Sequence, residues 1–277
     1  MTSAASRDTV GTTGDPAWHD GAHVSDCPGV FGKYRRASGY LVEVEGLAPV
    51  VIDMGPGVLG ALQRHAVPED ATILLSHLHA DHCLDVPSLL VLRRFGPHSA
   101  TAGRVPLVGP SGTAYRIGVA SAEEPGAVDD LSDTFEVSTW DVTPELEVKG
   151  DDDEVGLRVR AGRVDHPPES YGLRLTSADG RVLAYSGDTA YCESVVELAA
   201  GADVLLCEAS WTHQEGRPPG IHMSGREAGL VARRAGVGRL VLTHIPPWTD
   251  AEAVRAEAAS EYSGEILLAE PDLRLEI

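Results

Sequence analysis

The segment SHLHADH, residues 76–82, carries the strongest chemical signal in the sequence. Four side chains that can bind a metal fall within six of its positions: His77, His79, Asp81 and His82. On an extended segment, side chains two residues apart point the same way, so His77 and His79 face one point. The chain must then turn, which lets Asp81 and His82 face a second point nearby. This spacing therefore predicts two metal ions rather than one. Neutral imidazole and carboxylate suit zinc or a related ion such as manganese.

Three more candidate ligands lie just past the ends of predicted strands: His166 after 155–164, Asp188 after 181–185, and His244 after 240–243. Functional side chains concentrate where a rigid strand meets a loop. Taken singly, each has an ordinary explanation, since a histidine at a strand end is often structural and an aspartate beside a glycine often belongs to a turn. Taken as a set, the three residues supply the further ligands that a two-metal site needs.

Short strands and helices must position these residues. Apolar and β-branched runs predict strands at 40–44, 50–53, 72–76, 105–108, 155–164, 171–176, 181–185, 204–207, 240–243 and 273–277. Apolar residues at helical spacing predict helices within 58–66, 84–95, 113–120, 194–200, 226–235 and 251–262. Strands that run in groups with helices at their ends indicate layers of sheet covered by helices.

The composition excludes several classes of protein. The chain has 277 residues, 43% of them hydrophobic and 23% charged, which is typical of a globular protein with a sizeable core. No apolar run reaches about 18 residues, so a membrane span is excluded. With 22 basic and 42 acidic residues, the formal net charge is −20. Nucleic-acid binding needs cationic side chains that neutralise phosphates, so we expect no extensive nucleic-acid interface.

The cysteines indicate the compartment. Cys27, Cys83, Cys192 and Cys207 are scattered and do not make the disulfide framework of a small secreted domain. The first residues have neither the basic start nor the apolar core of a secretory signal. We therefore expect a reduced, cytoplasmic protein. Cys83 directly follows His82, and we expect a small buried residue there rather than a reactive thiol or a metal contact.

The motifs HLHADH, the isolated His166, SGDT and LTHIPP, in this order, resemble the metallo-β-lactamase fold over about residues 39–277. The resemblance implies an α/β protein, a four-layer αββα sandwich with the metals at one edge of its two sheets. It places a single domain of this fold at 38–277. We expect residues 1–37, which lack periodicity, to form an irregular lead-in with a weak first strand at 22–32.

The resemblance also implies two sets of ligands. One divalent ion would be held by His77, His79 and His166. The other would be held by Asp81, His82 and His244. Asp188 would bridge the two ions. Zinc is the expected metal, with manganese as the alternative.

Two further residues resemble the phosphodiesterase branch of this fold, which includes ribonuclease Z. His222 precedes the predicted helix 226–235, and Glu208 follows the predicted strand 204–207. In that branch a histidine and a glutamate form a pair that assists departure of the leaving group. The departing alkoxide needs a proton, and a histidine oriented by a carboxylate can supply it at neutral pH. Asp81 is a ligand and also a candidate to orient the attacking water.

The stretches LLSHLHADHCLD, YSGDT and LLCEASWTH resemble actinobacterial members of this branch, some of which hydrolyse cyclic nucleotides. Only 22 positions separate His166 from Asp188, too few for the long arm with which many ribonuclease Z chains grip tRNA. We therefore predict a dinuclear metal-dependent phosphodiesterase that converts a 3′,5′-cyclic nucleotide, or another small phosphodiester, to its monophosphate. Members of the branch are often dimers, which implies a homodimer.

The sequence leaves three alternatives open. The first is a ribonuclease Z-type tRNA 3′ endonuclease. The second is a lactonase, thioesterase or β-lactamase, because the same fold hosts these hydrolases; the Glu208–His222 pair opposes it. The third is a binding protein that keeps a metal for stability, which the seven filled ligand positions oppose. Residues that could wall a substrate pocket are Trp211, His213, Trp248 and the prolines at 218–219 and 246–247.

Overall fold

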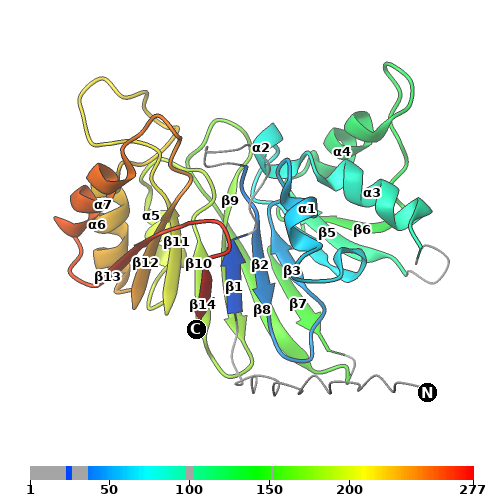
Figure 1. Cartoon of the computed structure of the whole chain (residues 1–277), viewed down its shortest axis with the longest axis horizontal. Coiled ribbons are helices and arrows are strands. Elements are labelled where there is room, and N and C mark those ends of the chain that lie inside the picture. Colours follow the sequence, from blue (N-terminus) through cyan, green and yellow to red (C-terminus); the bar gives the residue numbers. More distant parts are fainter. Residues whose placement is uncertain (1–22, 27–36, 98–102, 151) are drawn as a thin grey trace, which may run out of the picture.

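The computed structural model describes residues 23–26, 37–97, 103–150 and 152–277 (Figure 1). Within these residues the strands form two seven-stranded sheets that pack face to face, with helices on the two outer faces. The structure thus has the α/β class and the αββα layers that the sequence predicts. Residues 1–22 and 27–36, which make up most of the expected lead-in and include Cys27, lie outside the described residues.

The first sheet joins both ends of the described chain. Its strands run in the order β14 (Arg274–Glu276), β1 (His23–Asp26), β2 (Tyr40–Glu43), β3 (Val50–Ile52), β4 (Thr72–Leu74), β5 (Val105–Gly109) and β6 (Phe135–Thr139). The weak strand expected within 22–32 is β1, which pairs antiparallel with β2 and β14. From β3 to β6 all pairs are parallel, so these strands end at one edge of the sheet.

The second sheet begins as an antiparallel meander and continues as a parallel sheet. Its strands run in the order β13 (Glu265–Leu268), β12 (Arg239–Thr243), β11 (Val204–Glu208), β10 (Val182–Tyr185), β9 (Tyr171–Ser177), β8 (Val155–Arg163) and β7 (Glu145–Lys149). The strands β10, β11, β12 and β13 are parallel, which again brings their carboxyl ends to one edge.

Helices cover the outer face of each sheet. The first sheet is covered by α1 (Val58–Leu62), α3 (Val86–Phe95) and α4 (Thr113–Ser121), with the short α2 (Ala80–Cys83) and the 3-10 helix η1 (Pro68–Asp70) in its loops. The second sheet is covered by α5 (Glu193–Leu198), α6 (Gly225–Ala235) and α7 (Ala251–Ala259). Within the described residues, no helix is long and apolar enough to cross a membrane.

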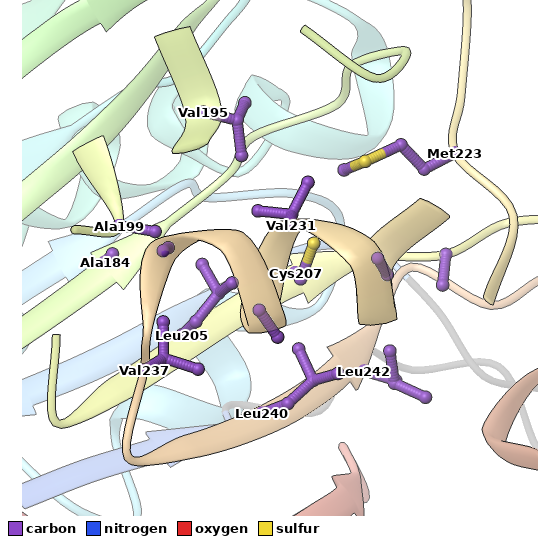
Figure 2. Packing of buried hydrophobic residues seen from close by; sticks show 14 of the residues in the cluster. Ala184, Val195, Ala199, Leu205, Cys207, Met223, Val231, Val237, Leu240 and Leu242 are labelled. Carbon is purple, nitrogen blue, oxygen red and sulfur yellow. The ribbon is translucent and has the colours of Figure 1, made fainter. Parts of the chain in front are cut away.

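Strand alternation produces three buried clusters. Along β11, Val204 and Leu206 face the space between the sheets, whereas Leu205 and Cys207 face the helices. Figure 2 shows the outer cluster, in which Leu205 and Cys207 pack with Val231 of α6. Each fully buried aliphatic side chain of this kind contributes roughly 1.5–3 kcal/mol. The matching cluster on the first sheet lies under α1, α3 and α4.

Three strands were not predicted from the sequence: β6, β7 and β13, whose apolar residues 266–268 were not assigned to a strand. Each lies at the end of its sheet, and most of its side chains are half-buried or exposed. An edge strand with few buried positions, such as β6 or β7, needs few apolar residues, so its hydrophobic signal is weak. The C-terminal helix, predicted to reach 262, ends at Ala259.

Candidate metal centre and proton donor

Loops at the carboxyl ends of the strands meet at one edge of the sandwich and carry every site residue that the sequence singles out. The loop after β4 leads through His77 and His79 into α2, which lies at the top of Figure 1. The loops after the second-sheet strands bring in His166 (after β8), Asp188 (after β10), Glu208 (at the end of β11), His222 (before α6) and His244 (after β12).

The first group of possible ligands consists of His77, His79, His166 and Asp188. One ligand atom from each lies within 4.8 Å of the others. Nδ1 of His79 is 3.0 Å from Nε2 of His77 and 3.3 Å from Nε2 of His166. Oδ2 of Asp188 is 3.7 Å from Nε2 of His77. Three nitrogens and one carboxylate oxygen therefore converge on one point.

The second group consists of Asp81, His82 and His244, again within 4.8 Å of one another. Oδ2 of Asp81 is 3.5 Å from Nε2 of His244 and 3.7 Å from Nε2 of His82. Oδ2 of Asp188 lies 3.4 Å from the same two nitrogens. Asp188 therefore adjoins both groups, as the bridging position requires. The structure brings together all seven residues named from the sequence.

The chemistry of this cluster fits divalent cations. Within the described residues, Nε2 of His82 and Oδ1 of Asp188 are buried without a hydrogen-bond partner. Such atoms cost about 1–3 kcal/mol each, which a bound cation would offset. Burial, reinforced by the neighbouring His82, lowers the pKa of His77 to about 2, so its imidazole is neutral and able to bind a metal. Imidazole nitrogens with carboxylate oxygens are a donor set that zinc and related ions prefer.

Hydrogen bonds from outside the cluster hold the rings in place. In four histidines Nδ1 contacts a neighbouring oxygen: His77 at Ser76 Oγ (3.1 Å), His82 at Asp53 Oδ2 (2.8 Å), His166 at Ile221 O (2.8 Å) and His244 at Ser210 Oγ (3.0 Å). Nε2 of each ring is then directed into the cluster. Contacts of this kind fix the orientation of metal-binding histidines.

Asp53 is a site residue that the sequence reasoning missed. Its buried carboxylate accepts hydrogen bonds from Ser76 N (2.7 Å), Ser76 Oγ (2.8 Å), His82 Nδ1 (2.8 Å) and the Tyr185 hydroxyl (2.8 Å). Its φ of 58° lies in the left-handed region, as does the φ of 53° at His244, and such strain is typical of functional sites. The available signal was an aspartate directly after the apolar strand β3, the pattern that identified Asp188.

Glu208 and His222 form the predicted pair. Nδ1 of His222 is 2.8 Å from Oε1 of Glu208. Backbone N–H groups of Thr189, Ser210 and Met223 also donate to this fully buried carboxylate, at 2.8, 3.2 and 3.2 Å. Burial raises the pKa of Glu208, and the hydrogen bond with His222 opposes that rise.

The His222 ring lies directly beside the cluster. Its centroid is 5.4 Å from that of His166 and 5.3 Å from that of His244. Together with Asp188 and His244 it forms a third group of donor atoms within 4.8 Å. Because Nδ1 is engaged by Glu208, Nε2 is the ring nitrogen left to face a molecule bound at the cluster.

The cluster opens to solvent on one side. The Asp81 side chain is 54% exposed, whereas those of His77 and His82 are fully buried. Burial would raise the pKa of Asp81, but its hydrogen bond with His244 holds that pKa below the usual range, so the carboxylate is ionised. An incoming molecule can therefore reach the cluster past a charged carboxylate.

The residues considered as pocket walls have different environments. Trp211 packs against the His222 ring, with centroids 5.3 Å apart and ring planes at 90°. His213 is turned toward the helices, because its Nδ1 is 3.0 Å from Ser224 Oγ and its N–H donates to Glu257. Trp248 is 83% exposed. Cys83 is buried, and burial raises the pKa of its thiol to about 11, which agrees with the expected structural role.

Comparison with known proteins gives a family match. Residues 49–245 match the β-lactamase superfamily domain. A Mycobacterium tuberculosis protein, named only as uncharacterised, is 51% identical over 244 residues, which are 88% of this chain and 87% of the relative. A protein of Mycobacterium bovis named ribonuclease Z is 31% identical over 258 residues, covering 84% of this chain and 89% of the relative.

Among solved structures, the metallo-β-lactamase fold protein YhfI of Bacillus subtilis superposes with a TM-score of 0.77. The match covers 93% of this chain and all of that chain (100%) at 24% identity. At this identity the likeness concerns the fold alone.

Proposed function

The chain belongs to the β-lactamase superfamily and is a hydrolase of the metallo-β-lactamase fold, and we propose that it hydrolyses a small phosphodiester, a 3′,5′-cyclic nucleotide, to the 5′-monophosphate. The observation that carries this proposal is the Glu208–His222 pair beside the cluster of candidate ligands. A buried carboxylate that orients a histidine is the device needed to protonate an alkoxide leaving group.

The proposed ligand sets follow the two groups of donor atoms. His77, His79 and His166 would hold one divalent ion, and Asp81, His82 and His244 the other, with Asp188 between them. Zinc and manganese both suit these donors. When bound, such ions supply Lewis acidity, which makes a water molecule nucleophilic near neutral pH and offsets negative charge on the phosphate.

The remaining steps belong to side chains of this chain. Asp81, ionised and on the open side, would accept a hydrogen bond from the attacking water and orient it. His222 would donate the proton on Nε2 to the departing 3′ oxygen. Glu208 would keep that ring in place, since the hydrogen bonds from Thr189, Ser210 and Met223 hold its own carboxylate rigid.

Three features support a small substrate. Between His166 and Asp188 the chain folds into only β9, β10 and short loops. Two arginines flanking the site are already paired: Arg163, at the end of β8, with Glu169, and Arg217 with Glu227. The formal net charge of −20 also opposes a polyanionic substrate.

A second candidate is tRNA processing, because a relative at 31% identity is named ribonuclease Z. The metal chemistry would be the same, and only the substrate would differ. A lactonase, thioesterase or β-lactamase activity is less well supported, because a carbonyl substrate of this fold does not need the Glu208–His222 pair.

A single assay separates these candidates. Purified protein of known metal content is incubated with 3′,5′-cyclic AMP, with and without zinc or manganese, beside a His79→Ala variant. Release of 5′-AMP that disappears in the variant supports the proposal. If the protein leaves cyclic AMP and an aryl phosphodiester intact but cleaves a tRNA precursor, a lactone, a thioester or a β-lactam, the corresponding alternative replaces it.

Two further expectations accompany the proposal. A cytoplasmic location fits the three free cysteines of the described residues, Cys83, Cys192 and Cys207, and cell fractionation with an antibody would test it. A homodimer is expected from the resemblance, and light scattering on the purified protein would measure it.

A further inference from the structure

Backbone hydrogen bonds join the two ends of the segment that carries His222. It begins at Trp211, three residues after the end of β11, continues through 212–221, and reaches His222 just before α6. The N–H of Trp211 donates to Met223 O at 3.3 Å, and the N–H of Gly225 donates to Trp211 O at 3.0 Å. Trp211 is thereby held beside the backbone that carries His222.

The His222 ring needs a second restraint. Glu208 engages Nδ1 alone, and a ring held at one atom can still rock about that hydrogen bond. Two of its ring neighbours, His166 and His244, are proposed metal ligands. The third is Trp211, whose ring stands perpendicular to His222 with centroids 5.3 Å apart. Trp211 is therefore placed to limit the tilt of the imidazole.

Trp211 is in turn backed by Arg217. The guanidinium carbon of Arg217 lies 5.9 Å from the centre of the Trp211 ring, over its face. A planar guanidinium on an aromatic face is a favourable contact that a lysine does not reproduce. The Arg217 side chain is only 15% exposed, which reduces screening by solvent.

Glu227 holds Arg217 through a bidentate ion pair. Nη1 and Nη2 of Arg217 donate to Oε2 and Oε1 of Glu227 at 2.8 and 3.1 Å. Glu227 also completes the capping box of α6 with Ser224, whose N–H and hydroxyl donate to it at 2.8 Å each. The first turn of α6 thus anchors a chain of contacts through Arg217 and Trp211 to His222.

We propose that Arg217 is a positioning residue, which holds Trp211 against His222 so that Nε2 of His222 points at the leaving oxygen. This role rests on the proposed phosphodiesterase activity. In that reaction the water oxygen forms a new bond to phosphorus and its proton passes through Asp81 to solvent. The bond from phosphorus to the 3′ oxygen breaks, its electron pair stays on that oxygen, and the proton of His222 Nε2 neutralises it. His222 then takes a proton back from solvent, so that the net reaction consumes one water molecule.

The leaving group makes this role measurable. A ribose 3′ oxygen leaves as a strongly basic alkoxide and needs the proton, whereas 4-nitrophenolate is stable without one. A misdirected His222 therefore slows cyclic AMP hydrolysis but not hydrolysis of bis(4-nitrophenyl) phosphate. A variant that merely loosens the fold or the metal site slows both substrates alike.

The test compares both substrates in matched variants of the full-length protein loaded with metal. For Arg217→Gln we expect kcat on cyclic AMP to fall about 10- to 100-fold, with KM and the nitrophenyl reaction within about 2-fold of the wild type. Trp211→Leu should behave in the same way, and Trp211→Phe should recover most of the activity on cyclic AMP. Arg226→Gln is the control: Arg226 lies on α6 beside Glu227 and makes an exposed ion pair with Glu261, which follows α7, so its loss should change neither reaction.

Arg217→Lys is a second variant, for the case that Arg217→Gln does not fold. It keeps a positive charge opposite Glu227 but lacks the planar group over Trp211, so the same difference between substrates should appear at smaller size. Equal losses on both substrates, or no loss in either Arg217 variant, would overturn the positioning role while leaving the phosphodiesterase intact. A wild-type protein inactive on both substrates would overturn the proposed function and this role with it.

Discussion

The two sheets contribute to the site in different ways. The first sheet supplies four candidate ligands from one short segment, 76–82. One buried aspartate, Asp53, forms hydrogen bonds with Ser76 and His82 of that segment. The second sheet supplies Glu208 from the end of β11, and it supplies His166, Asp188, His222 and His244 from separate loops. The half of the site from the first sheet, here called the first half, therefore needs only local geometry to form. The half from the second sheet, the second half, forms only if that whole sheet is in register.

Asp188 is where the two halves meet, so its replacement should have the largest effect. Asp188→Asn removes the charge that adjoins His77, His82 and His244. We expect loss of bound metal and a fall in activity of about 10³-fold or more, because ions of this kind supply several kcal/mol of transition-state stabilisation. Metal analysis by mass spectrometry and a cyclic AMP assay measure both effects.

The control for that prediction is Asp165→Asn, an exposed aspartate on the loop just before His166. It should retain its metal and its activity. An Asp188→Asn protein that kept both ions would mean that each half binds its metal independently.

His222 tests whether the second half has a function beyond holding metal. His222→Ala should keep its bound metal, because the seven proposed ligands remain, but kcat on cyclic AMP should fall about 10²- to 10⁴-fold, the usual contribution of a general acid. Metal analysis beside kinetics makes the distinction. If His222→Ala loses metal in proportion to activity, the residue is a ligand rather than a proton donor.

The same contrast explains what the sequence predicted and what it did not. The segment 76–82 could be recognised from spacing alone, and His166, Asp188 and His244 from their places after apolar strands. Asp53 also follows an apolar strand, but its role depends on contacts with His82 and Tyr185 that lie 29 and 132 residues away. Such long-range pairing has no signature in local spacing.

The contacts that hold His222 in place could not be predicted from the sequence either. Glu208 and His222 were identified through resemblance, but the contact of Arg217 with Trp211 depends on how the loop 212–221 folds over α6. The edge strands β6 and β7 were missed for a different reason, because half-exposed strands carry little apolar periodicity.

Asp53 provides a sharper test of the first half. Asp53→Asn keeps the size of the side chain but replaces one charged acceptor that serves Ser76, His82 and Tyr185. Because groups that orient a metal-binding histidine typically contribute 10- to 100-fold in affinity, we expect metal affinity to fall by about that factor. Calorimetric titration of the metal-free protein with zinc measures this affinity. Unchanged affinity would show that the segment 76–82 holds its own geometry.

The smallest predicted effect concerns the hydrogen bond that joins the halves through Tyr185. This buried hydroxyl of the second sheet donates to Asp53 of the first sheet at 2.8 Å. Tyr185→Phe keeps the ring packing and leaves Asp53 with its Ser76 and His82 donors. A hydrogen bond to a charged group contributes about 1.5–3 kcal/mol, so the melting temperature of the metal-free protein should fall by a few degrees.

The effect of Tyr185→Phe on metal affinity decides how the halves are coupled. If Tyr185 only joins the two sheets, zinc affinity should change by less than about threefold while stability falls, because His82 still contacts Asp53 directly. A loss of affinity as large as in Asp53→Asn would mean that the tyrosine sets the position of the carboxylate. The first half would then depend on the second sheet for its geometry, and the contrast between a locally formed and an assembled half of the site would no longer hold.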